Sequence, residues 1–476
     1  MTETSRPDAV VVGSGPNGLT AAVVLAQAGL SVTVLEASDS IGGGTRSAEL
    51  TLPGVLHDVC SAVHPFGAAS PVFRSLPLER HGLEWRWPEV DLVHPLDGGR
   101  AGVLLRSIDD TAAGLGDDGA AWRQVFGRAS ARFPDLADDI LRPLLQVPRH
   151  PVTMVDFGLR ALLPATWLAR RFRSDEARAL FAGIAAHVIH PLSRPATSAG
   201  GVMLTASGHH VGWPVAAGGS QAVTTALAGL LAELGGTVET GVRVSSLADL
   251  PPARLRLFDT SPAGLVAIAG DALPSRTRRA LQRWRYGPAS FKLDLAVEGG
   301  VPWTAEAARR SGTVHVGGTI GEVALAEAEV HRGRLPERPF VLVAQQYLAD
   351  PQRSVGDVHP VWAYAHVPQG YAGDATEPML RQLERFAPGV RERIVAQHVM
   401  SPADFAGYNA NYVGGDISTG ANDLRQLIFR PRVALDPYAT GIPGVYLCSA
   451  ATPPGAGVHG MCGYHAARRA LRSLGL

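Results

Sequence analysis

A glycine-rich turn near the amino terminus constrains the fold more than any other feature. In DAVVVGSGPNGLTAAVVLAQAGLSVTVLEAS, three valines precede Gly13, Gly15 and Gly18, which form G-x-G-x-x-G. A short continuous apolar run is typical of a strand buried on both faces of a parallel sheet. An Ala- and Leu-rich helix is expected at about residues 19–28, and a second strand over residues 31–35. The order strand, glycines, helix and strand predicts a Rossmann-type βαβ unit.

Each part of this unit has a role in holding a dinucleotide. Gly13 permits the tight turn, Gly15 lets a pyrophosphate approach the backbone, and Gly18 lets the helix pack on the strand. The helix that starts around Pro16 and Asn17 turns free N–H groups and the positive end of its dipole towards the phosphates. We therefore expect these five residues to bind the cofactor.

An acidic residue and a second glycine run complete the expected site. Glu36 ends the second strand, where it can accept hydrogen bonds from ribose hydroxyls and disfavours a 2′-phosphate. Ala37 follows it, and the run that contains Gly43 and Gly44 leads to Thr45 as a second close backbone approach. These features together predict a dinucleotide site.

Composition limits the class of protein. A chain of 476 residues, 46% hydrophobic and 18% charged, has enough apolar material for two or three domains. Its formal net charge is zero, so nothing indicates a nucleic-acid surface. Three scattered cysteines suggest neither a disulfide framework nor a metal site. The first residues do not resemble a signal peptide, and no apolar run reaches the ~18 residues of a membrane span. We expect a cytoplasmic protein without a metal.

The rest of the chain alternates between helical and mixed segments. Residues 108–203 have apolar spacings of three and four, which predict helices. A helix at about residues 220–234 and a strand ending at Asp259 then restore the α/β pattern. Near the carboxyl terminus, Gly455, Gly457 and Gly460 also spell G-x-G-x-x-G, but only sixteen residues follow. A second dinucleotide unit therefore cannot be built there.

The two ends of the chain together resemble the superfamily of FAD-dependent amine oxidases and phytoene desaturases. The likeness is sharpest to phytoene desaturase-like oxidoreductases, in the stretches GPASFKLDLAV, NYVGGDI, QLIFRP and YLCSAATPPGAGVHGMCGYHAA. It implies an α/β fold in which a Rossmann-type FAD-binding domain is interwoven with a mixed-sheet plus helical substrate domain. The FAD-binding domain is expected at 1–51, 212–264 and 415–476, and the substrate domain at 52–211 and 265–414.

The resemblance also assigns cofactor contacts beyond the first unit. It implies FAD as the cofactor and places Val244 beside the adenine. Ala450, Gly457, Val458 and His459 fall in the turn before the last helix, which in relatives points its amino terminus at the flavin pyrimidine ring. Arg46 comes later than the family's usual arginine, so both a cofactor role and a surface position stay open for it.

Lys292 is the only lysine of the chain, beside 42 arginines. An ammonium can lose its proton or hold a water, whereas a guanidinium stays charged and planar. Its strand alternates apolar residues with Lys292 and Asp294, so one reading is a solvent-exposed pair. The other places Lys292 over the flavin, as amine oxidases keep a strand lysine that holds a water near flavin N5. Lys292 and His459 are our candidate catalytic residues.

Several other polar residues are expected to be structural. Cys462 fits a small buried side chain better than a covalent flavin link. Residues 162–174 fit an ordinary packing helix better than one that rests on a membrane. The following histidines fit core or turn positions better than catalytic ones: His64, His187, His190, His209 and His210.

The expected function is that of an FAD-dependent oxidoreductase that takes a hydride from a C–H bond of a small, largely apolar substrate, as a dehydrogenase or desaturase does. The alternatives are a flavin-dependent polyene isomerase, an amine oxidase and a non-catalytic flavoprotein partner. The electron acceptor stays open between oxygen, a quinone and another protein.

Overall fold

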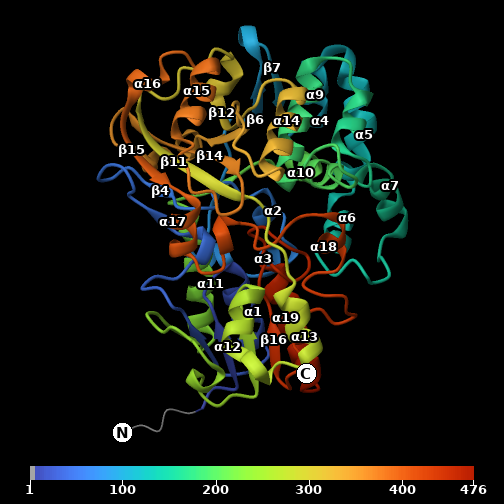
Figure 1. Ribbon diagram of the computed structural model, residues 1–476, viewed down its shortest axis with the longest axis vertical. Helices are drawn as coiled ribbons and strands as arrows, with labels where there is room; N and C mark the ends of the chain where they lie inside the picture. Colours follow the sequence, from blue (N-terminus) through green and yellow to red (C-terminus); the bar gives the residue numbers. More distant parts are fainter. Residues whose placement is uncertain (1–5) are drawn as a thin grey trace.

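The computed structural model describes residues 6–476 and contains two large sheets, one in each half of the molecule (Figure 1). The lower half is built on a five-stranded parallel sheet with the order β16-β10-β1-β2-β9. Its strands are β1 Ala9–Val12, β2 Val32–Leu35, β9 Thr237–Glu239, β10 Leu255–Phe258 and β16 Val445–Leu447. The two ends of the chain thus share one sheet, and the predicted Rossmann-type domain is confirmed.

Helices cover both faces of this parallel sheet because its strands are apolar on both sides. The side chain of Val11 packs with helices α1, α11 and α19, whereas Val10 packs with α12 and α13. These helices are α1 Pro16–Gln27, α11 Gln221–Glu233, α12 Pro262–Ala269, α13 Ser275–Gln282 and α19 Met461–Ser473. Leu265 and Leu281 belong to this core, so the second segment of the domain, expected to span residues 212–264, extends past residue 264.

The upper half holds a seven-stranded mixed sheet with the order β15-β11-β14-β13-β12-β6-β7. Its strands are β6 Val90–Pro95, β7 Ala101–Leu104, β11 Ala289–Glu298, β12 Ser311–Val316, β13 Val341–Ala344, β14 Val358–Val367 and β15 Ile394–Met400. One face carries Phe291, Leu293 and Leu295 into an apolar core. The opposite face carries Lys292 and Asp294, because side chains alternate along a strand. This polar face is buried as well.

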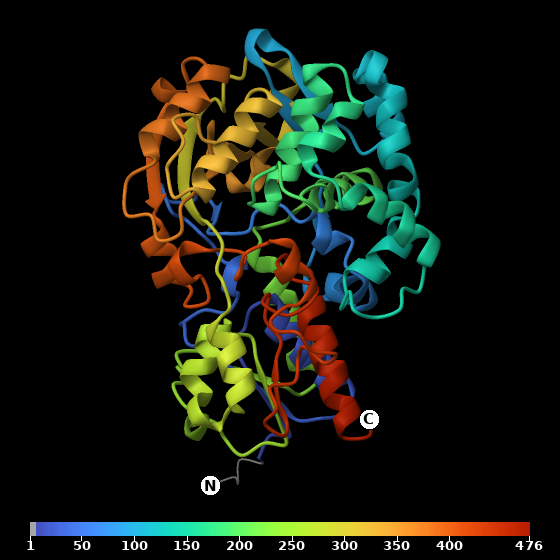
Figure 2. The ribbon, with the colours of Figure 1, turned by 45° about the vertical axis from the view of Figure 1, so that its right-hand side comes forward.

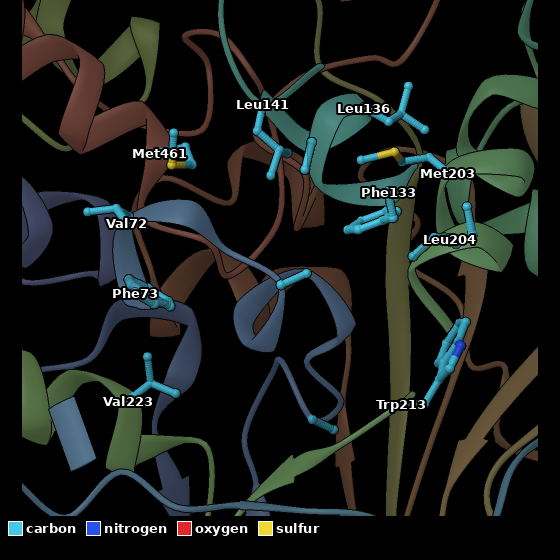
Figure 3. Close-up of a cluster of buried hydrophobic side chains, with 14 of the residues drawn as sticks. Val72, Phe73, Phe133, Leu136, Leu141, Met203, Leu204, Trp213, Val223 and Met461 are labelled. Carbon is cyan, nitrogen blue, oxygen red and sulfur yellow. The ribbon is translucent and has the colours of Figure 1, made fainter. Parts of the chain in front are cut away.

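Helices follow each other through the segment where periodicity predicted them. They are α4 Ile108–Gly114, α5 Gly119–Ala131, α6 Phe133–Ile140, α7 Pro151–Ala161, α8 Ala165–Leu168, α9 Asp175–Ala185 and α10 Ser198–Val211. Figure 3 shows part of their core, in which Phe133, Leu136 and Met203 gather where α6 meets α10. Within residues 162–174, Leu168 and Phe172 are buried, as expected of a packing helix, whereas Trp167 is 58% exposed. Among residues 6–476, no helix combines the length and the apolar character needed to cross a membrane.

Short elements join the two halves, and the chain passes between them several times (Figure 2). The short strands are β3 Ser47–Ala48, β4 His57–Asp58, β5 Trp85–Arg86 and β8 Val215–Ala216. The remaining α-helices are α2 Pro65–Ala68, α3 Pro71–Ser75, α14 Ile320–His331, α15 Thr376–Phe386, α16 Val390–Arg393, α17 Pro402–Tyr408 and α18 Leu424–Ile428. This arrangement agrees with interwoven domains.

A buried ion pair stabilises the junction between the halves. Arg353 Nη1 donates to Asp58 Oδ2 at 2.6 Å, and its Nη2 donates to the Ala216 carbonyl at 2.7 Å. Asp58 also accepts from the Ser220 N–H at 2.7 Å, immediately before α11. The pair therefore fixes the start of a Rossmann-domain helix to the loop that precedes β14.

Candidate functional site

A single cavity of about 870 Å³ runs from the carboxyl ends of β1 and β2 to the polar face of the seven-stranded sheet. Thirteen of the predicted site residues line it. They are Gly13, Gly15, Pro16, Asn17, Glu36, Ala37, Gly43, Gly44, Thr45, Val244, Ala450, Gly457 and Val458. Gly18, Lys292 and His459 are not among the lining residues.

The glycine turn has the close packing that its spacing predicted. Gly13 has a φ of +102°, which favours glycine, and a Cβ on Gly18 would lie 2.1 Å from the Gly13 carbonyl oxygen. Gly18 therefore serves helix–strand packing. A Cβ on Gly43 would lie 3.0 Å from the Gly15 Cα, so the two glycine runs abut. Together they leave bare backbone on the cavity wall, where a diphosphate fits.

Glu36 is held in place by the turn itself. Its Oε2 accepts from the Ser14 N–H at 2.9 Å and the Ser14 hydroxyl at 2.6 Å, and its Oε1 accepts from the Ser38 N–H. Arg46 Nη2 lies 3.4 Å from Oε1 and donates to the Ser40 carbonyl at 2.8 Å. Arg46 is thus a buried, cavity-lining residue, which excludes the surface position left open for it.

Asp259 is a cavity residue that our list of site residues missed. It follows β10, and its Oδ2 accepts from the Gly18 N–H at 2.9 Å. A Cβ on Gly15 would lie 2.8 Å from the same oxygen. Burial raises the pKa of Asp259 to about 7, and the nearby Glu36 carboxylate adds to the rise. An acidic residue at the carboxyl end of a parallel strand was a signal that the sequence offered.

The turn before α19 lines the cavity, but His459 faces the helix. Its Nδ1 accepts from the Met461 N–H at 3.1 Å, and its carbonyl accepts from the Ser70 hydroxyl at 2.6 Å. Burial lowers the pKa of His459 to about 4, so the ring is neutral at pH 7. This geometry caps α19 and gives no support to a catalytic role for His459.

Lys292 lies behind the cavity wall. Its ammonium contacts both carboxylate oxygens of Asp294 and lies 5.9 Å from the ring centroid of Trp362, which lines the cavity. Both charged residues are fully buried, so the solvent-exposed pair is wrong. Although burial alone would raise the pKa of Asp294, Lys292 and two histidines, His57 and His398, hold it well below its usual value. Lys292 is thus on the predicted face, with its charge already neutralised.

The part of the cavity beyond the expected flavin position is walled by the substrate domain. Its lining residues there are His187, Ile189, Leu204, Trp213, Thr313, Leu342, Trp362 and Tyr364. None of these was a predicted site residue, because they come from strands and helices that are far apart in sequence.

The histidines that were expected to be structural, and the three cysteines, lie either in the cavity wall or in the protein core. His187 lines the cavity, contrary to the core position expected for it, and its Nε2 lies 3.0 Å from His315 Nε2. His64 also lines it and shares a 2.7 Å hydrogen bond with the Ser220 hydroxyl. His190, His209 and His210 pack against other aromatic rings. Cys60, Cys448 and Cys462 are free and buried, and burial raises the pKa of Cys462 to about 12.

Comparisons with known proteins find similar sequences along nearly the whole chain. A family model described as an NAD(P)-binding Rossmann-like domain matches residues 11–76. The "Pyridine nucleotide-disulfide oxidoreductase domain-containing protein 2" of Mus musculus is 25% identical, over 98% of this chain and 94% of its own. The hydroxyneurosporene desaturase of Rhodobacter capsulatus is 24% identical, over 98% of both chains.

The fold is likewise shared with a solved structure. A putrescine oxidase has a TM-score of 0.62 with 19% sequence identity, over 99% of each chain. Sequence matches along nearly the whole chain thus agree with a fold match of the same extent. The chain fits the superfamily of FAD oxidoreductases that contains the amine oxidases and the carotenoid desaturases.

Proposed function

We propose that this chain is an FAD-dependent dehydrogenase or desaturase that takes a hydride from a C–H bond of a small, mainly apolar substrate. The observation that carries the proposal is the single cavity that connects the dinucleotide turn with a chamber walled by Ile189, Leu204 and Leu342. A bound flavin supplies the two-electron acceptor for such a hydride. Loss of the hydride and of a proton from the neighbouring atom gives the double bond.

The residues of the chain have separate tasks in this proposal. The bare backbone at Gly13 and Gly15 holds the diphosphate at the start of α1, where helix N–H groups face it. Glu36 accepts from a ribose hydroxyl. The turn at Gly457 and Val458, with α19 behind it, borders the ring position. The substrate-domain chamber excludes water and places the C–H bond over the ring.

The cavity argues against a cationic amine as substrate. Among the described residues that line it, the carboxylates are Glu36 and Asp259, both at the nucleotide end. Asp294 is not among the lining residues and is already paired with Lys292. An ammonium group in the chamber would therefore be desolvated without a counter-charge, which is costly.

Two measurements test the proposal. The purified protein is expected to be yellow and to release FAD, not FMN, on heating. A colourless protein that binds NAD alone would refute the assignment of FAD as the cofactor. Anaerobic mixing with candidate polyenes, alcohols and amines is then expected to bleach the flavin band with a substrate of the proposed class. Product formed by the pre-reduced protein without re-oxidation would instead support the isomerase.

A further inference from the structure

The polar face of the seven-stranded sheet brings unpartnered hydrogen-bond donors to the inner end of the cavity. Thr313 lies opposite Ala344, and Ala344 lies opposite Trp362, so the three residues form one row across β12, β13 and β14. Leu342 and Tyr364 are paired in the adjacent row. Residues in register across a sheet point to the same face, and both rows contribute lining residues.

These donors have lost water without gaining a protein partner. The Thr313 hydroxyl and the Trp362 Nε1–H are buried and make no hydrogen bond to another residue of the described chain. A buried donor without a partner is unfavourable, so such groups are found with a partner in most proteins. Burial also keeps the pKa of Tyr364 far above its usual value, so its hydroxyl stays protonated as a further donor.

The charges around the inner end select the kind of acceptor. The arginines that line the cavity, Arg46 and Arg243, lie at its nucleotide end, and Lys292 is neutralised by Asp294. Burial lowers the pKa of His187 to about 3, so its ring is uncharged at pH 7. Within the described residues, no free cation is therefore available there for a carboxylate or phosphate.

We infer that the inner end of the cavity binds an uncharged oxygen acceptor of the substrate, a carbonyl or hydroxyl oxygen, through Thr313, Trp362 and Tyr364. The inference rests on the proposed function and narrows its substrate class: the substrate has an apolar body and one oxygen-bearing end. A pure hydrocarbon would leave the donors unpartnered. The three donors would then determine which end of the substrate enters first, and hence which C–H bond lies beside the flavin ring.

Equilibrium dialysis of the FAD-loaded protein with two matched probes tests this inference. Benzylacetone carries a ketone, and butylbenzene has the same carbon skeleton without it. The near-isosteric variants Thr313→Val and Tyr364→Phe each remove one donor. Each is expected to weaken benzylacetone binding by about 2- to 12-fold, the effect of one neutral hydrogen bond, and to leave butylbenzene binding within about twofold.

Thr205→Val is the matched control. The Thr205 hydroxyl is also buried and unpartnered, but Thr205 does not line the cavity, so neither probe should change. The inference is overturned if the wild type does not bind benzylacetone, if Thr313→Val and Tyr364→Phe change both probes alike, or if Thr205→Val has the same effect.

The test separates this inference from the proposed function. Dialysis records binding without turnover. Selective ketone binding by a protein whose flavin no substrate reduces would refute the proposed function and keep the acceptor site. If a hydrocarbon reduces the flavin and the donor variants have no selective effect on binding, the proposed function is supported and the acceptor site is refuted.

Discussion

The Gly18 N–H donates to the Oδ2 of Asp259 at 2.9 Å, so a carboxyl group occupies the wall of the turn that is built for a diphosphate. The two residues are 241 positions apart in the sequence, and parallel pairing of β1 with β10 brings them together. When it is ionised, the Asp259 carboxylate places a negative charge beside the negatively charged diphosphate of a bound dinucleotide. Protonation of Asp259 removes that repulsion.

Binding of FAD is therefore expected to weaken as the pH rises through about 7, the pKa to which burial raises Asp259. Below this pH the carboxyl group is neutral and affinity is constant; above it, the Kd rises by up to about tenfold per pH unit because binding requires a proton. Flavin fluorescence titrations of the apoprotein between pH 6 and pH 9 measure the slope. Asp259→Asn should abolish it, whereas the exposed control Asp109→Asn should retain it. A flat wild-type profile would contradict this assignment.

Gly15→Val should abolish retention of FAD. Even its Cβ would lie 2.8 Å from Asp259 Oδ2, and the rest of the side chain would fill the space of the diphosphate. The ratio of flavin absorbance to protein absorbance after gel filtration measures retention. Gly114→Val is the control, since Gly114 is an exposed helical residue with no heavy atom within 4 Å of its added Cβ. Full flavin content in Gly15→Val would show that the phosphate turn is wrongly placed.

Lys292→Met should lower the free energy of unfolding by about 3–5 kcal/mol, because it leaves the buried Asp294 carboxylate without its ammonium partner. Urea unfolding measures the loss. The double variant Lys292→Met/Asp294→Leu removes both charges and should recover most of it. A loss below about 1 kcal/mol would mean that the pair behaves like an exposed one.

Lys292→Arg should slow flavin reduction by about tenfold, since Lys292 does not line the cavity but lies against the lining residue Trp362 and can act by orienting that ring. Stopped-flow reduction with a saturating substrate measures the rate. A rate of flavin reduction that falls by about 10²- to 10³-fold would instead indicate that Lys292 contacts the reacting groups directly. An unchanged rate would leave it a purely structural residue.

Arg353→Met should lower the free energy of unfolding by about 3–5 kcal/mol and should loosen the junction between the two halves, because it leaves the buried Asp58 carboxylate without its guanidinium partner.

The same ion pair predicts a pH dependence of stability. Burial alone would raise the pKa of Asp58, but Arg353 and the Ser220 and Ser47 donors hold it below its usual value. A depressed folded pKa stabilises the protein above the unfolded value of 3.8, and this contribution is lost as the pH falls below it. Thermal unfolding at pH 7 and pH 3 should therefore show a smaller difference for Asp58→Asn than for the wild type.

The sequence by itself determined the cofactor half of this protein. The strand, the glycines, the helix and Glu36 are contiguous, and their chemistry depends on local backbone conformation, so their spacing located nine residues that line the cavity. The other four, Val244, Ala450, Gly457 and Val458, were implied by the family resemblance. The alternation around Lys292 likewise predicted the correct face of its strand, because the two-residue period is a local property. It could not predict whether that face met solvent or protein.

Tertiary structure decided the substrate half. Thr313, Trp362 and Tyr364 form one donor surface only because β12, β13 and β14 pair in a particular register, and a shift of one residue would turn these side chains to the opposite core. Asp259 reaches the phosphate turn through parallel pairing with β1, and His459 turns from the expected flavin contact to cap α19. Each depends on contacts between segments far apart in the chain, which no local pattern encodes.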